Sequence, residues 1–196
     1  MFHGAHLEVE FFALLVGIDE EIVGRVADAG CPDPDCKGPL HRGDYARKPR
    51  GALVATAGEA FVMRFSLCCG WCRCRTLPPS VRFLGRRVYF GAVVLLGCLW
   101  ALCGSIEAAG VPVRTVRRWL GWWSSSFPPT PTWVELRARF APPPPRESLL
   151  PLSLIERLAD GLGPSDSEKI LLKAAQFLAP VTTQSCPDAS RFVRVG

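Results

Sequence analysis

Two closely spaced cysteine pairs, Cys31-Pro-Asp-Pro-Asp-Cys36 and Cys69-Gly-Trp-Cys72, lie 32 residues apart in this chain. Each pair sits on a short turn, which two prolines stiffen in the first pair. Four thiolates on two such turns are the ligand set of a tetrahedral structural zinc. The spacing therefore predicts a Zn²⁺ site made by Cys31, Cys36, Cys69 and Cys72, within a zinc ribbon that covers residues 28–79.

The other cysteines leave the ligand set partly open. Cys68 and Cys74 flank the second pair, and either could replace Cys69 or Cys72 as a ligand. The chain has nine cysteines, and its first residues lack the basic start of a secretory signal. Reduced, metal-binding or buried cysteines are therefore favoured over a disulfide framework, and we expect a cytoplasmic protein.

The segment between the two pairs predicts a small β structure. Residues 60–67 alternate large apolar side chains with smaller or polar ones, which is typical of a strand. We expect this strand to form a hairpin with residues 52–57. The basic, turn-rich residues 41–51 are expected to form a loop.

Hydrophobic periodicity predicts helices in the rest of the chain, so the fold class is mainly α with a small β-hairpin zinc ribbon. Residues 88–106 and a stretch from about Pro112 have helical patterns, and proline-rich breaks follow at 127–131 and 142–145. The expected divisions are an N-terminal helical segment (1–27), the zinc ribbon (28–79), a helix-turn-helix (80–126), a C-terminal helical appendage (127–182) and a flexible tail (183–196).

Charge is distributed unevenly along the chain. Residues 1–40 carry a balance of −6, residues 41–118 a balance of +10 and residues 119–196 a balance of +1. A strongly basic middle segment favours a polyanionic partner. A chain rich in arginine because its gene is GC-rich would give a similar count.

Residues 100–120 have the pattern of a helix-turn-helix. Gly110 supplies a turn residue that tolerates positive φ, and Val116 and Trp119 supply apolar contacts between the helices. Arginine matches both guanine edges and phosphates, so a basic exposed side would suit the DNA major groove. The expected partner is double-stranded DNA. The predicted DNA-binding residues are Arg114, Thr115, Arg117 and Arg118, with Arg47, Lys48 and Arg50 on phosphates.

Two other interpretations remain open. Val88–Ile106 is 19 residues long and uncharged, so it could be a membrane span instead of a buried pair of helices. The protein could also be an interaction module that binds a protein partner through Trp119, Trp122, Trp123 and Trp133. No nucleotide-binding or hydrolase motif is present, and the three histidines do not cluster with carboxylates, so we expect no enzymatic activity.

Four motifs together carry a resemblance to a known group of proteins. They are the Cys-x4-Cys pair, Arg-Lys-Pro-Arg-Gly at 47–51, the Cys-rich run at 68–80 and Val-Arg-Thr-Val-Arg-Arg-Trp at 113–119. This order resembles the zinc-ribbon and helix-turn-helix region of bacterial insertion-element (transposase-like) proteins and of related small bacterial proteins. The resemblance implies a DNA-binding protein of a mobile element, as an accessory, a remnant or a stand-alone binder.

Overall fold

The computed structural model describes residues 8–50, 59–84, 89–105, 110–145, 147–160, 162 and 166–182. The fold is mostly helical with two small antiparallel sheets. The helices are α1 (Val9–Ala29), α2 (Glu59–Val62), α3 (Gly91–Leu102), α4 (Val113–Gly121), η3 (Trp122–Ser126), α5 (Pro131–Arg137), α6 (Leu152–Ala159), α7 (Ser167–Leu178) and η4 (Ala179–Thr182). The strands are β1 (Leu40–Arg42), β2 (Tyr45–Ala46), β3 (Met63–Arg64), β4 (Leu67–Cys69) and β5 (Arg75–Thr76).

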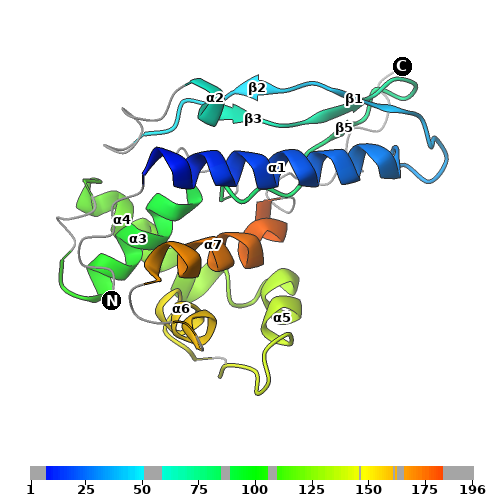
Figure 1. The fold of residues 1–196 in the computed structure, drawn as a ribbon. Coiled ribbons are helices and arrows are strands. Elements are labelled where there is room, and N and C mark those ends of the chain that lie inside the picture. Colours follow the sequence, from blue (N-terminus) through cyan, green and yellow to red (C-terminus); the bar gives the residue numbers. More distant parts are fainter. Residues whose placement is uncertain are drawn as a thin grey trace.

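Helix α1 lies between the sheets and the other helices (Figure 1). Its 21 residues span about 30 Å. Phe12 and Leu15, near its start, belong to the core of the helical body, whereas Val23 packs with Phe65 and Leu67 of the sheet region. The helix ends at Ala29, and the next residue, Gly30, has a φ of 78° and donates its N–H to Ala27 O at 3.1 Å, as a glycine after a helix commonly does.

The strands pair differently from the predicted hairpin. β4 lies between β1 and β5, with His41 opposite Cys68 and Cys68 opposite Arg75, and β2 pairs with β3. The prediction of a loop over 41–51 and of a strand over all of 60–67 is therefore wrong: residues 59–62 are helical, β2 lies within the predicted loop and β1 extends into it. Residues 52–57 lie outside the described residues. Short strands carry too little periodicity to fix their partners in advance.

Helix α3 forms the centre of the helical body. Residues 91–99 of this helix are all buried, and it packs against α4 and α7. Ile170 and Leu171 of α7 and Leu154 of α6 belong to the same core cluster. Residues of α6 and α7 therefore share one core with α3, and the division of the chain at residue 127 stays a prediction.

The described part of the apolar run, residues 89–105, contains one helix, α3, where a buried pair of helices was predicted and a membrane span was the alternative. α3 has 12 residues, about 18 Å of helix, whereas a bilayer core is about 30 Å thick. Within the described ranges, no helix combines the length and the apolar character needed to cross a membrane. Val88 and Ile106 themselves lie outside those ranges.

A buried polar network joins α1 to the segment that leads into α3. Asp19 accepts hydrogen bonds from Val81 N, from Ser80 Oγ and from Arg82 Nε, each at 2.7 Å. Arg82 also donates through Nη1 to Phe61 O at 2.9 Å, and Thr182 Oγ1 accepts from Ser80 N at 3.0 Å. These bonds connect the N-terminal helix, the middle of the chain and its last described turn.

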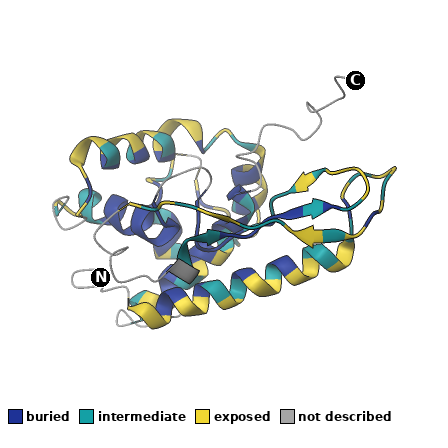
Figure 2. Ribbon diagram, turned by 90° about the horizontal axis from the view of Figure 1, so that it is seen from above, coloured by how far each residue is buried: buried dark blue, intermediate teal, exposed yellow. Residues whose placement is uncertain are grey.

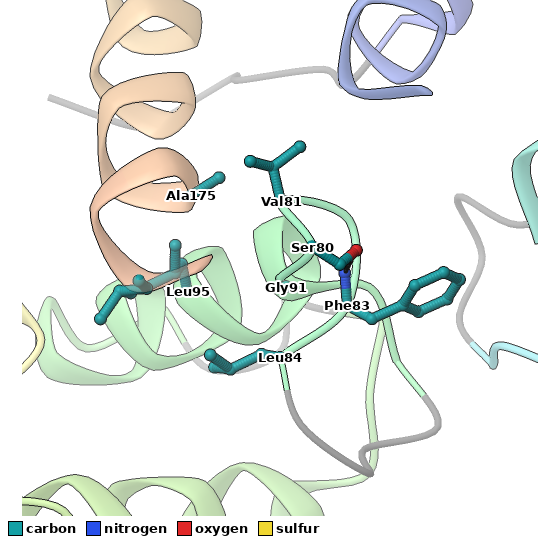
Figure 3. A pocket seen from close by; sticks show the side chains of 8 residues that line it. Ser80, Val81, Phe83, Leu84, Gly91, Leu95 and Ala175 are labelled. Carbon is teal, nitrogen blue, oxygen red and sulfur yellow. Dashed lines mark hydrogen bonds between the residues drawn. The ribbon is translucent and has the colours of Figure 1, made fainter. Parts of the chain in front are cut away.

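A small cavity lies where this segment meets α3 and α7 (Figure 3). Val81, Leu84, Leu95 and Ala175 are among the side chains that line it. Its volume of about 10 Å³ is roughly what one water molecule needs. We therefore treat it as a packing defect and not as a ligand site.

Candidate metal centre and basic helix

The structure brings the four predicted cysteines together at the C-terminal end of α1. Their sulfur atoms all lie within 4.8 Å of one another, with Cys31 Sγ 3.6 Å from Cys72 Sγ and Cys36 Sγ 3.5 Å from Cys69 Sγ. A disulfide would need about 2.05 Å between sulfurs. A tetrahedral site with metal–sulfur bonds of about 2.3 Å places its sulfurs about 3.8 Å apart. The cluster therefore has the donor set and the dimensions of a metal site.

The first cysteine turn follows directly from the end of α1. Cys31 N donates to Gly38 O at 3.1 Å, and Cys36 N donates to Asp33 O at 3.1 Å, so both cysteines are held by backbone hydrogen bonds. Lys37, the residue after the second cysteine, has a φ of 49°. Gly38 has no room for a side chain, since a Cβ there would lie 2.8 Å from Cys69 Sγ.

The second cysteine turn connects β4 to β5 and repeats this geometry. Cys69 N donates to Cys74 O at 3.0 Å, and Arg73 N donates to Cys69 O at 3.2 Å. Arg73, the residue after the second cysteine, has a φ of 62°. Trp71 N donates to Cys69 Sγ at 3.4 Å, as backbone amides do towards a negatively charged sulfur. The two turns thus present their cysteines to the same point.

Hydrogen bonding concentrates negative charge on one sulfur of the cluster. Burial raises the pKa of Cys69, but the N–H groups of Cys72 and Trp71 and the thiol of Cys36 lower it to about 6. Burial is the main cause that raises the pKa of Cys31. Four thiols this close cannot all ionise in the absence of a cation, because each thiolate disfavours the next. A bound metal ion would remove this repulsion, because it stabilises all four sulfurs as thiolates.

The remaining described cysteines lie outside the cluster. Cys68 Sγ points to the carbonyl oxygens of Cys69 and Arg73, and Cys74 Sγ points to Arg75 O. Neither is among the four clustered ligands, so the geometry selects Cys69 and Cys72 from the second turn. Cys98 is buried in α3, whereas Cys103 is exposed at the end of α3. Cys186 lies outside the described residues.

Helix α4 has one buried and one basic side. Val116 and Trp119 are buried against the core, where the Trp119 ring meets Tyr89 edge to face at 4.9 Å. Arg114, Arg117 and Arg118 are exposed, and Thr115 is half-buried. The structure therefore places the three predicted arginines of this helix on the surface.

The connection before α4 is longer than the turn of a helix-turn-helix. Gly110 has a φ of 56°, which confirms the predicted left-handed turn residue. However, α3 already ends at Leu102 and Gly104 has a φ of 80°. Ten positions separate α3 from α4, of which 106–109 are not described, whereas the motif has a turn of three to four residues.

The three predicted phosphate-binding residues have different environments. Lys48 and Arg50 are exposed. The Arg47 guanidinium lies 5.0 Å from the centre of the Phe83 ring, and its burial lowers the Arg47 pKa. Arg82 lies over Phe83 as well as over Phe65, so Arg47 is part of a stack of arginine and phenylalanine side chains. Its position supports a structural role.

The tryptophans of the predicted docking segment are mostly in the core. Trp119, Trp123 and Trp133 have at most 4% of their surface exposed, and Trp122 is half-buried against Phe127. The exposed tryptophan is Trp71, with 70% of its surface accessible, on the second cysteine turn. It lies between Cys69 and Cys72 of the cluster, and the sequence analysis did not single it out.

Comparison of the chain with protein-family models, with curated proteins and with solved structures gave no match in any of the three. The resemblance to insertion-element proteins therefore stays a prediction.

Proposed function

We propose that this chain is a zinc-stabilised DNA-binding protein without catalytic activity. The observation that carries the proposal is α4, which buries Val116 and Trp119 and exposes Arg114, Arg117 and Arg118. An exposed row of arginines on a short helix suits both phosphate contacts and guanine edges in a major groove. The basic balance of residues 41–118 agrees with a polyanionic partner.

Zinc is the metal that this proposal assigns to the cysteine cluster. A four-sulfur donor set with sulfurs about 3.8 Å apart is the structural zinc site of zinc ribbons. Two similar cysteine turns at one end of the β1–β4–β5 sheet support the same assignment. Such a site needs reduced thiols, which favours a reducing compartment such as the cytoplasm.

A helix-turn-helix with a long connection, and an origin in a bacterial mobile element, complete the proposal. The first is supported by the packing of α3 on α4 and by the left-handed Gly110. The second rests on the sequence resemblance alone.

The test is a gel-shift measurement with zinc-loaded protein and duplex DNA of mixed sequence. We expect binding that falls steeply with salt, because counterions are released from neutralised phosphates. A variant with Arg114, Arg117 and Arg118 all changed to Ala should lose that binding. Arg139→Ala, an exposed arginine of the turn after α5 that pairs with Glu135, is the matched control. Equal binding by the triple variant and the control would refute the role of α4.

A further inference from the structure

Trp71 stands out from the other large apolar side chains of the surface. It has 70% of its surface exposed, the largest fraction among the exposed large apolar residues of the described chain. Its backbone is anchored to Cys69 Sγ, and its indole packs against Gly38, where a Cβ would meet Trp71 Cγ at 3.0 Å. A rigid aromatic ring that is open to solvent is a typical binding residue.

Two basic residues that are close to Trp71 or to Gly38 in the sequence have an unusual backbone. Lys37 and Arg73 have left-handed φ values of 49° and 62°, a conformation that glycine adopts without strain. Both side chains are exposed, and within the part of the chain that the structure describes neither makes a hydrogen bond or an ion pair. The positive charges of Lys37 and Arg73 are therefore not paired with any acidic side chain among the described residues.

The adjoining face of the sheet is also basic and open. Arg42 pairs with Glu20 of α1 at 2.6 Å and Leu67 packs with Val23, so their row of side chains faces α1. Neighbours along a strand alternate in direction, so His41, Cys68 and Arg75 face away from α1. Figure 2 shows exposed positions on the strands that flank β4.

Charge selects the class of partner. Residues 31–50 and 63–76 hold eight Lys or Arg and three Asp. Arg64 is buried and Arg42 pairs with Glu20 and Asp44. The charge that attracts a polyanion therefore comes mainly from the exposed side chains of Lys37, Lys48, Arg50, Arg73 and Arg75. The Arg75 guanidinium lies 5.1 Å from the centre of the Tyr45 ring, which adds a second aromatic group beside a cation. Alternating cations and aromatic rings are the composition of a surface that binds unpaired nucleotides.

We propose that Trp71, Lys37, Arg73 and Arg75 form a binding site for single-stranded nucleic acid. A base stacks on the Trp71 indole, and the three cations bind the adjoining phosphates. The bases of a duplex are stacked on one another, so the ring selects a single strand. This site goes beyond the duplex contact proposed for α4. Figure 1 shows α4 near the N-terminal end of α1, and β1 and β5 near its C-terminal end. Helix α1 itself is about 30 Å long.

Fluorescence anisotropy with the full, zinc-loaded chain tests this proposal. The probes are a labelled single-stranded DNA of about 15 nucleotides and the duplex of the same sequence. We expect Trp71→Ala to weaken single-strand binding at least about fivefold, the lower end of the loss for one stacked base. Trp71→Phe should retain most of the affinity. Val134→Ala, an exposed apolar residue on α5, is the matched control and should bind as the parent does.

The two proposals fail separately in this experiment. The triple arginine variant of α4 should lose duplex binding and keep single-strand binding. No single-strand binding by the parent, or equal binding by the parent and Trp71→Ala, overturns the Trp71 site whatever the duplex result. A loss of bound metal in both Trp71 variants, together with loss of binding, would show that the ring only supports the cysteine turn and would also overturn it.

Discussion

The carboxylate of Asp19 and the guanidinium of Arg82 lie 2.7 Å apart, with 1% and 0% of their side chains exposed. Asp19 occupies a position of α1 that is otherwise apolar, four residues after Leu15 and four before Val23. It is satisfied by three hydrogen bonds from Ser80, Val81 and Arg82. A buried pair of this kind stabilises one register of α1 against the rest of the chain, since a shifted helix would leave both charges unpaired.

Asp19→Asn should lower the free energy of unfolding by about 3–5 kcal/mol, because it leaves the buried Arg82 charge without a counter-charge. Urea unfolding of the metal-loaded protein measures this. The control is Glu20→Gln, which removes the half-exposed pair with Arg42 and should cost no more than about 1 kcal/mol. Similar losses for the two neighbouring substitutions would contradict the importance of the buried pair.

Cys36→Ser and Cys72→Ser should each reduce bound metal from one ion per chain to much less than one. Both remove a ligand of the cluster, and the energy of metal binding in small sites is largely energy of folding. Native mass spectrometry counts the ions. Cys74→Ser removes a neighbouring thiol outside the cluster and should keep the full ion. If Cys74→Ser lost the metal and Cys72→Ser kept it, the ligand assignment would be wrong.

Gly38→Ala should weaken metal binding, since its Cβ would lie 2.8 Å from Cys69 Sγ and push a ligand out of position. Competition with a chelator measures the change in affinity. Gly17→Ala is the matched substitution on α1, where a Cβ meets nothing within 4 Å. It should leave the metal site intact and stabilise the helix by about 0.5–1 kcal/mol. Equal metal affinity of the two variants would count against the close approach at Gly38.

Base contacts and phosphate contacts should respond differently to substitution. Arg114→Ala should cost about 1–3 kcal/mol of duplex affinity and relax sequence preference if its side chain contacts a base edge. Lys48→Ala should weaken binding by a similar factor on all sequences and reduce the salt slope by about one. Gel shifts at several salt concentrations separate these effects. An unchanged salt slope for Lys48→Ala would remove it from the interface.

The cysteine cluster could be predicted because its information is local. Spacing, prolines and a glycine place each pair on a turn, and thiolate chemistry selects a common cation for both pairs. Spacing alone could not decide which two cysteines of the second turn bind the ion, among Cys68, Cys69, Cys72 and Cys74. That choice depends on the direction of each side chain along β4 and through the following turn, which requires the strand register.

The amphipathic character of α4 could also be predicted from the sequence, since apolar and basic residues alternate at helical spacing. The strand pairing could not be predicted, because β2, β3 and β5 have two residues each and are too short to show a periodic pattern. The burial of Trp119, Trp123 and Trp133 could not be predicted, for a related reason. Aromatic side chains at a helix end serve a core or a docking surface equally well, and only the packing of α3 and α5 against them decides.

The sequence by itself determined the chemistry of the cysteine pairs, the basic middle of the chain and its helical character, because composition and short periodic patterns specify each of them. The tertiary structure alone decided that α1 connects the cysteine cluster to the helical body, that Asp19 meets Arg82 and that Trp71 remains outside. Asp19 and Arg82 are 63 positions apart, and Cys31 and Cys72 of the cluster are 41 positions apart. No local pattern encodes such a contact, because it forms only when several elements pack together.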